Sequence, residues 1–270
     1  MLQHNRFYPP SPSPLHRSEN HVFPKNVNKP EVLFLLQENS IKKNKTMKLK
    51  QLEMLLQSVA GFREPKLKHE QYETGHHIGA RMLFTMANAG DIEGKAVLDL
   101  GIGCGRLGIA ASHLGAAYVL GVDIDPDALA QCQENIQAIR EEEEEEDEDE
   151  EMLTNIDLLC ADVSDDSGGL WDRLSSSAFQ VVIMNPPFGT KAGNKGLDAV
   201  FLRRALAIAS ETVYSLHKTS TREYILRKAK EWGARRAEVV AQLRYDLPAT
   251  YSFHRRASKD IEVDFYRFEK

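Results

Sequence analysis

Residues 95–108 read KAVLDLGIGCGRLG, and this stretch decides the fold. A short apolar strand from Lys95 to Leu100 leads through glycines at 101, 103 and 105 into a helix that begins at Arg106. Glycine permits a tight turn and a close approach of the backbone to a ligand, which in α/β proteins binds at the carboxyl ends of the strands. The alternative is a tight strand-to-helix turn that binds nothing, and the glycines alone do not exclude it.

Apolar strands and helices alternate after this turn. The predicted strands are 117–125, 155–162, 179–188 and 212–217, and the predicted helices include 126–139, 197–209 and 220–233. Two further strands, 234–248 and 259–268, are expected to form an antiparallel pair at one edge. The alternation predicts an α/β fold, a Rossmann-like, mostly parallel doubly wound sheet with a C-terminal antiparallel edge.

Composition divides the chain into a tail and one domain. Residues 1–46 are rich in proline and lack a sustained period, which predicts a disordered N-terminal extension. Residues 47–270 are expected to form the domain, and the acidic run 141–151 (EEEEEEDEDEE) is expected to be a disordered insertion. The residues leave open whether Met1 or Met47 is the natural start.

Charge and cysteine content narrow the class of protein. The net charge of -6 comes from the acidic run, and residues 217–259 are predominantly basic, which suits phosphates and equally a solvated surface. No apolar run is long enough for a signal core or a membrane span. Cys104, Cys132 and Cys160 form no CxxC pair, so neither a disulfide framework nor a metal site is expected. Nucleus and cytoplasm are the expected compartments.

Acidic residues end the second and third strands, beside the glycine turn. Asp123 occupies the position at which doubly wound folds bind ribose hydroxyls, and Asp162 ends the next strand. The spacing GxGxG differs from the dinucleotide pattern GxGxxG, and Cys104 and Arg106 crowd the pyrophosphate position. S-adenosyl-L-methionine has no pyrophosphate, so it fits this turn better than a dinucleotide does.

The run VVIMNPPFGT, residues 181–190, ends the fourth strand in an amide, two prolines and an aromatic residue. We expect this run to hold a planar nitrogen substrate, whose amine is a poor nucleophile because its lone pair is delocalised. The Asn185 side-chain oxygen and the Pro186 carbonyl are expected to accept its hydrogens, with Pro187 stiffening the turn and Phe188, expected to be exposed, stacking on the planar group. The alternative is a strand-ending turn with a surface aromatic.

DLGIGCG, GVDID, CADV and VVIMNPPF, in this order, resemble the class I S-adenosylmethionine-dependent methyltransferases. From residue 47 onward, PKLKHEQYETGHHIGARML, VVIMNPPFGTK, VYSLHKTSTRE and LRYDLPATYSFH resemble the methyltransferase-like protein 5 family, which methylates adenosine N6 in small-subunit (18S) ribosomal RNA. The resemblance implies catalytic roles for Asn185, Pro186, Pro187 and Phe188. It implies a cofactor site made of Gln71, Thr74, Asp99, Gly101, Gly103, Cys104, Arg106, Asp123, Asp162 and Val163.

The resemblance also implies a heterodimer with a small zinc-binding activator, which would pair with an edge strand. Residues 155–161 are expected to form such an edge, because they are apolar and carry no proline or lysine that would block pairing. Expected RNA contacts are Lys191, Lys195, His254, Arg255 and Arg256, for which a solvated surface is an equal alternative.

The chain departs from the family pattern at a few positions. Gly75-His76 replaces an expected Arg-Pro, and Arg106 replaces a small apolar residue. Two other functions remain open: a protein glutamine N5-methyltransferase, since such enzymes use a similar NPPY motif, and a non-catalytic RNA-binding scaffold. Phe188 and the basic C-terminal stretch favour RNA over a protein amide.

Overall fold

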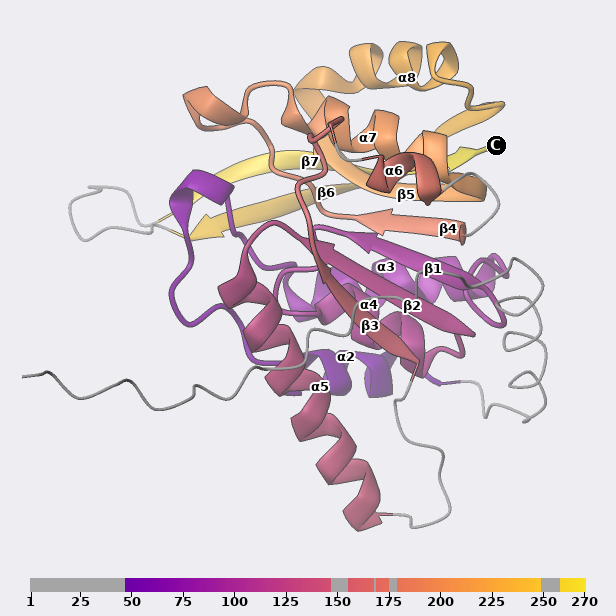
Figure 1. Cartoon of the computed structure of the whole chain (residues 1–270). Helices are drawn as coiled ribbons and strands as arrows, with labels where there is room; N and C mark the ends of the chain where they lie inside the picture. Colours follow the sequence, from indigo (N-terminus) through magenta and orange to yellow (C-terminus); the bar gives the residue numbers. More distant parts are fainter. Residues whose placement is uncertain (1–46, 147–154, 168, 175–178, 249–257) are drawn as a thin grey trace, which may run out of the picture. The chain divides into compact units, whose positions relative to one another are not determined.

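The computed structural model describes residues 47–146, 155–167, 169–174, 179–248 and 258–270. Its strands form one sheet in the order β3-β2-β1-β4-β5-β7-β6 (Figure 1). The strands are β1 (Ala96–Leu100), β2 (Tyr118–Asp123), β3 (Ile156–Cys160), β4 (Phe179–Met184), β5 (Ala209–Lys218), β6 (Arg236–Pro248) and β7 (Ser258–Glu269). Strands β1 to β5 run parallel, whereas β7 is antiparallel to both of its neighbours. The predicted sheet, with its antiparallel C-terminal edge, is confirmed.

Helices cover both faces of this sheet. One face carries α2 (Leu49–Ser58), α3 (His76–Asn88), α4 (Arg106–His113) and α5 (Pro126–Glu146). The other carries α6 (Leu170–Arg173), α7 (Leu197–Ile208) and α8 (Arg222–Glu231), which lie above the sheet in Figure 1. Short 3-10 turns are η1 (Leu67–His69), η2 (Ala192–Asn194) and η3 (Thr219–Thr221).

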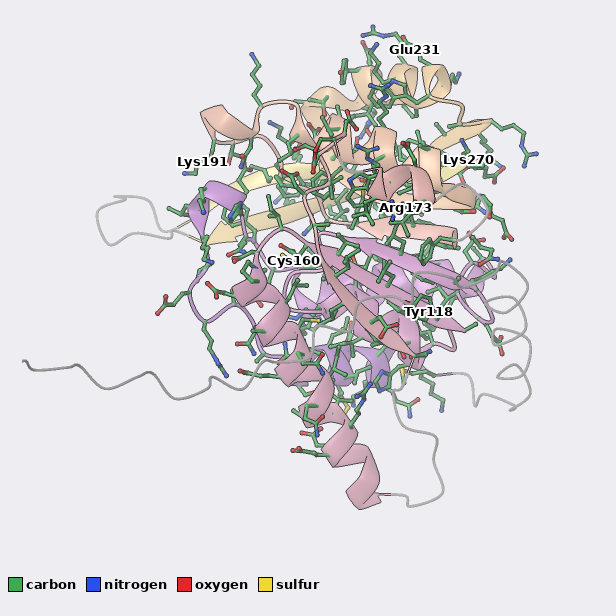
Figure 2. The ribbon with its side chains drawn as sticks, in the orientation of Figure 1. Tyr118, Cys160, Arg173, Lys191, Glu231 and Lys270 are labelled. Carbon is green, nitrogen blue, oxygen red and sulfur yellow. The ribbon has the colours of Figure 1, made fainter. Side chains whose placement is uncertain are left out.

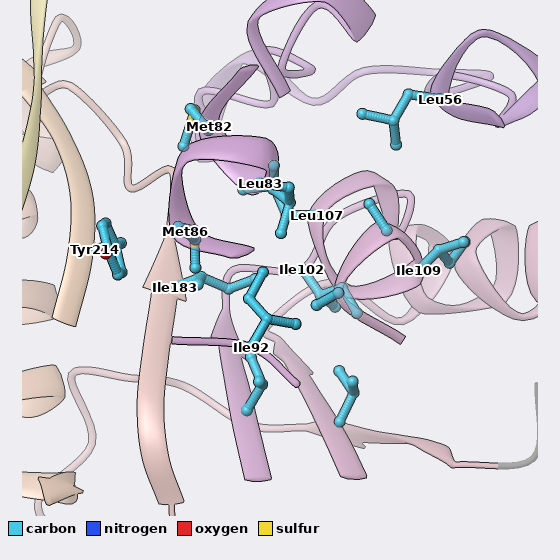
Figure 3. Packing of buried hydrophobic residues seen from close by; sticks show 14 of the residues in the cluster. Leu56, Met82, Leu83, Met86, Ile92, Ile102, Leu107, Ile109, Ile183 and Tyr214 are labelled. Carbon is cyan, nitrogen blue, oxygen red and sulfur yellow. The ribbon is translucent and has the colours of Figure 1, made fainter. Parts of the chain in front are cut away.

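The central strand β4 is buried on both faces. Val181 and Ile183 belong to the apolar cluster under α2 to α5, and Val182 and Met184 belong to the cluster under α6 to α8. This division follows from the two-residue period of a strand, whose successive side chains point to opposite faces. Figure 3 shows Ile183 close to Met86 of α3. Packing on both faces therefore fixes the point at which β4 ends and the Asn-Pro-Pro-Phe motif begins.

The topology places a crevice at the ends of β1 and β4. These strands are parallel neighbours, with Leu100 opposite Met184. The chain leaves β1 toward β2 on one side, and it returns from β3 to β4 on the other side. Such a reversal of strand order is where open α/β sheets bind ligands. Residues that follow β1, β2, β3 and β4 all meet at this end of the sheet.

Helix α5 is longer than predicted, and this corrects the expected disorder of residues 141–146. The helix continues to Glu146, and Gln137 Nε2 donates a hydrogen bond to Glu141 Oε1 over 3.0 Å. Glutamate is a good helix former, and a bond between residues four apart stabilises a helix. The rest of the acidic run and the predicted extension 1–46 lie outside the described residues. Among the described residues, no helix combines the length and the apolar character that crossing a membrane requires.

Candidate active site

The turn after β1 lies against the end of β2. The Gly103 N–H donates to Asp123 Oδ2 over 2.9 Å, and the Gly101 N–H donates to the Val122 carbonyl over 2.7 Å. Gly103 has a φ of 57°, and a Cβ at this position would lie 2.7 Å from the Phe62 ring. Only glycine meets both constraints, so the backbone of this turn stays open to a ligand.

A cavity of about 290 Å³ opens beside this turn. All of the expected cofactor residues line it: Gln71, Thr74, Asp99, Gly101, Gly103, Cys104, Arg106, Asp123, Asp162 and Val163. Asn185 and Pro187 of the motif line the same cavity. The glycine turn and the motif lie about eighty positions apart in the chain, and the structure brings them to one site.

Asp123 holds two turns together. Its Oδ2 accepts the Gly103 N–H, and its Oδ1 accepts the Asp125 N–H over 2.9 Å. Burial raises the pKa of the Asp123 carboxyl, although these two amide donors favour its charged form. A carboxylate has about four lone-pair sites, so these two bonds leave acceptor capacity that faces the cavity.

Asp99 is the most unusual group in the cavity. Its side chain is buried, with 1% exposure, and its oxygens make no well-aligned hydrogen bond among the described residues, although the Gly108 N–H lies close enough to favour the charged form. Burial raises the pKa of this carboxyl to about 8, and the nearby charge of Asp123 acts in the same direction. A buried acid without a well-aligned donor is costly unless a partner supplies one. The site therefore provides for a cationic or donor group at Asp99.

Gln71 and Arg106 bind the protein itself. Gln71 Nε2 donates to Asp125 Oδ2 over 2.6 Å, and its Oε1 accepts the Lys66 N–H over 2.6 Å. Arg106 donates from Nη1 to the Thr74 carbonyl over 2.8 Å and from Nη2 to the Val59 carbonyl over 3.1 Å. Both side chains line the cavity, but these bonds assign them to holding its wall in place.

Cys104, Asp162 and Val163 complete the cofactor side of the cavity. Burial raises the pKa of the Cys104 thiol to about 11, so this thiol stays protonated and apolar in character. Asp162 Oδ1 accepts the Ser164 N–H over 2.8 Å and the Ser164 hydroxyl over 2.7 Å. Val163 is buried, with 4% exposure. These residues form a shaped, largely apolar wall with one carboxylate at its rim.

Asn185 is oriented by the segment before α3. Its Nδ2 donates to Thr74 Oγ1 over 3.0 Å, which fixes the amide so that Oδ1 points away from Thr74. Pro186, which is buried, and the cavity-lining Pro187 follow it. The residue before a proline is held extended, so the backbone here is preorganised. The structure thus gives Thr74 a second role, as the residue that orients Asn185.

The expected exposure of Phe188 is wrong. Its side chain is 3% exposed and packs in the apolar cluster under α2 to α5. It does not line the cavity, because two prolines turn the chain back toward the core before the aromatic residue is reached. Stacking of Phe188 on a substrate base stays a prediction, and the described conformation does not present the ring for it.

The expected RNA contacts lie in two regions. Lys191 and Lys195 are exposed in the loop after the motif, and Figure 2 shows Lys191 near η1 and far from Tyr118, which begins β2. His254, Arg255 and Arg256 lie outside the described residues. The sequence analysis missed Glu70, which lines the cavity and is buried. Glu70 directly precedes Gln71, which was expected to bind the cofactor, and this position next to an expected site residue could have indicated it.

Comparisons with known proteins agree with this geometry. Residues 71–163 match the family described as Ribosomal protein L11 methyltransferase (PrmA). The chain is 49% identical to the rRNA N(6)-adenosine-methyltransferase Mettl5 of Drosophila melanogaster over 224 residues, which cover 83% of this chain and 97% of the relative. It is 48% identical to the rRNA N(6)-adenosine-methyltransferase METTL5 of Danio rerio, with 82% and 99% covered. The crystal structure of PH1948 from Pyrococcus horikoshii is similar, with a TM-score of 0.65 and 31% identity, covering 83% of this chain and 96% of that one.

Proposed function

The chain belongs to the Mettl5 family of rRNA N6-adenosine-methyltransferases, and we propose that it methylates the N6 amine of an adenosine in small-subunit (18S) rRNA with S-adenosyl-L-methionine as methyl donor. The observation that carries this proposal is the single cavity lined by both Asp123 and Asn185. One of these residues suits the cofactor and the other suits a planar amine.

The residues at the glycine turn fit the cofactor. The acceptor capacity of Asp123 suits the two ribose hydroxyls, and the buried carboxyl of Asp99, without a well-aligned donor among the described residues, suits an ammonium group. Val163 and Asp162 offer an apolar wall and an acceptor for the adenine ring. When bound, the cofactor supplies a methyl group made electrophilic by its sulfonium charge. The absence of a dinucleotide-type glycine spacing agrees with this choice.

The motif residues position the amine. Asn185 Oδ1, directed away from Thr74, accepts one hydrogen of the adenine N6 group, and the Pro186 carbonyl accepts the other. Two fixed acceptors favour a pyramidal nitrogen and direct its lone pair toward the methyl group. Their contribution comes from preorganisation, because neither group must reorient during the reaction. No general base is required, because the methylated ammonium is acidic and loses its proton to water.

Methylation of a protein glutamine is the second candidate, and the family that matches part of the chain is described as a methyltransferase of a ribosomal protein, with no glutamine named. That match ends at residue 163, before Asn185, so it concerns the cofactor half of the site. Relatives that span the motif as well include the rRNA adenosine methyltransferases of Drosophila melanogaster and Danio rerio. The amine-binding half therefore favours RNA.

A small zinc-binding activator is the proposed partner, and β3 is the proposed docking edge. Strand β3 lies at the edge of the described sheet, with Leu158 and Leu159 half-buried. The Val119 N–H donates to the Asn155 carbonyl, and the Ala161 N–H donates to the Asp123 carbonyl. Because main-chain groups alternate in direction along a parallel strand, the Leu158 N–H faces the open edge. An edge with an outward N–H and apolar side chains suits strand addition by another chain.

Since small-subunit rRNA is made in the nucleus and used in the cytoplasm, we propose both compartments for this protein.

Transfer of an isotope-labelled methyl group tests the function. Incubation of the chain and the activator with labelled S-adenosyl-L-methionine and unmodified small-subunit rRNA is expected to label N6 of adenosine. A release-factor peptide that carries a glutamine is expected to stay unlabelled. Label in the peptide alone would support the glutamine methyltransferase, and label in neither substrate, with the cofactor bound, would support the scaffold.

A further inference from the structure

The segment of residues 66–75, here called the pocket segment, is attached to three parts of the site. Gln71 bonds to Asp125 after β2, and Thr74 accepts a bond from Asn185 of the motif. Glu70 bonds to the loop of residues 189–196, here called the motif loop. One short segment of the chain is therefore hydrogen-bonded to the cofactor side of the site, to the Asn185 amide and to the motif loop.

Within the part of the chain that the structure describes, the Glu70 carboxylate accepts its hydrogen bonds from donors of the motif loop. Its Oε2 accepts the Thr190 N–H over 3.1 Å and the Thr190 hydroxyl over 2.9 Å. Its Oε1 accepts the Lys191 N–H over 3.1 Å and Asn194 Nδ2 over 3.0 Å. The side chain is 5% exposed, so these bonds form away from bulk water. Hydrogen bonds to a buried charged acceptor are stronger than those between neutral groups.

The backbone of Glu70 is itself held in an uncommon conformation. Its φ is 50°, and it is the one described residue other than glycine with a positive φ. Such a conformation costs of order 1–3 kcal/mol and persists where the surroundings enforce it. Glu70 ends the 3-10 turn η1, where its N–H donates to the Leu67 carbonyl, and the side-chain bonds to the motif loop add to the contacts that hold this conformation.

The motif loop is compact and faces the cavity. Gly189 has a φ of 68°, and a Cβ there would lie 3.2 Å from the Asn194 carbonyl oxygen, so the loop closes tightly on itself. Asn194 Nδ2 also donates to the Lys68 carbonyl of the pocket segment over 3.0 Å. Gly193 and Asn194 line the cavity, and Lys191 and Lys195 are exposed on the loop. Movement of this loop would move both a wall of the site and two basic side chains.

We propose that Glu70 is a positioning residue for methyl transfer: its carboxylate fixes the motif loop to the pocket segment, so that cofactor binding and the order of the substrate-facing loop are coupled. The inference rests on the proposed function, because it assigns the loop to the RNA side of that site. Glu70 acts through Thr190, Lys191 and Asn194, and not on the reacting atoms.

The chemistry of the bonds selects the informative variants. The Thr190 and Lys191 N–H groups and the Asn194 amide donate to Glu70, so Glu70→Gln places an amide N–H among donors and loses at least one bond at nearly constant volume. Glu70→Ala leaves all of the donors without an acceptor. The matched control is Glu211→Gln, which removes a glutamate charge on the surface, where Glu211 pairs with Lys95.

Hydrogen exchange and steady-state kinetics of the full chain test the proposal. In the wild type, S-adenosylhomocysteine is expected to slow exchange of the Thr190 and Lys191 amides, and in Glu70→Gln this protection is expected to be lost. With unmodified small-subunit rRNA, kcat is expected to fall about 100-fold in Glu70→Gln, while the affinity for S-adenosylhomocysteine changes less than about tenfold, as for displaced catalytic groups. Glu211→Gln is expected to behave like the wild type.

Two results would overturn the proposal. One is unchanged protection of the motif loop together with unchanged kcat in Glu70→Gln. The other is a loss of activity accounted for by unfolding, seen as a lowered melting temperature in Glu70→Gln with normal loop protection in its folded fraction. If the wild-type chain methylates no RNA, the proposed function fails, and hydrogen exchange still decides whether Glu70 couples the loop to the cofactor.

Discussion

Replacement of Asp99 by asparagine gives a sharp test of the cofactor site, because the carboxyl has a distinctive titration. Burial raises its pKa to about 8 from 3.8. At pH 6.5 such a group is protonated in about 97% of molecules, and the α-amino group of the ligand, which is that of a free amino acid, is cationic. If the two groups form one ion pair in the complex, they share a single proton. Binding at pH 6.5 therefore releases about one proton.

The affinity for the cofactor should then depend on pH in a defined way. Below pH 8 the affinity rises with pH, because Asp99 must lose its proton to pair with the ammonium group. At higher pH the affinity falls again, because the amine loses its own proton. A maximum between the two pKa values follows. In Asp99→Asn the rising limb disappears, and the loss of a hydrogen bond to a charged group, about 1.5–3 kcal/mol, weakens binding by about 10- to 150-fold.

The titration of Asp99 also predicts that the free energy of unfolding falls as pH rises, whereas the affinity for the cofactor rises over the same range. The folded-state pKa of Asp99 lies above the unfolded value, so the unfolded chain ionises first as pH rises, and folding stability falls between pH 3.8 and about 8. At pH 7 this cost is about 4 kcal/mol at 1.36 kcal/mol per pH unit. Since asparagine does not ionise, Asp99→Asn is expected to stabilise the cofactor-free protein at pH 7 by up to about 4 kcal/mol.

Calorimetric titration with S-adenosylhomocysteine measures the proton release. The binding enthalpy is compared at pH 6.5 in buffers of different ionisation enthalpy, and the slope gives the number of protons. Asp172→Asn, which neutralises an exposed carboxyl on α6, is the control. The assignment of Asp99 to the ammonium group is refuted if the wild type releases no proton, or if Asp99→Asn releases as many as the wild type.

Three further substitutions test the remaining assignments. Asn185→Ala is expected to lower kcat on rRNA by at least about 100-fold with S-adenosylhomocysteine affinity nearly unchanged, because an oriented acceptor is lost; retained turnover would contradict the role of the motif. Asp123→Ala is expected to weaken S-adenosylhomocysteine binding about 100-fold by calorimetry, because both ribose bonds to a charged acceptor disappear, and unchanged affinity would place the cofactor elsewhere. Leu158→Pro removes an outward N–H and is expected to abolish co-purification with the activator, whereas Leu158→Ala retains it; a Leu158→Pro protein that still co-purifies would exclude β3 as the docking edge.

Local pattern was sufficient to predict the strands and the groups at their ends. Asp123 and Asn185 follow buried apolar runs, and parallel strands bring their carboxyl ends to one edge, so their meeting in one cavity follows from topology. Phe188 was predicted wrongly because the same local pattern does not specify where a side chain points after two prolines. That direction depends on packing against α2 to α5, which is a property of the whole fold. The helical residues up to Glu146 were missed for a different reason, because charge repulsion was weighed above helix propensity.

Arg106 shows why a departure from a family pattern is difficult to interpret without coordinates. A charged residue in place of a small apolar one, next to a cofactor turn, suggests a weakened site. In the structure the guanidinium turns away from the turn and donates to the carbonyls of Val59 and Thr74, while it pairs with Glu73 over 2.9 Å. The Thr74 and Val59 carbonyls belong to residues 32 and 47 positions away from Arg106, so the local sequence around Arg106 does not reveal these bonds. Because Thr74 also bonds to Asn185, Arg106 supports the Asn185 amide through the same residue. From the sequence alone, arginine at position 106 suggests a weakened site. In the structure it forms a further bond between helix α4 and the pocket segment, at Thr74.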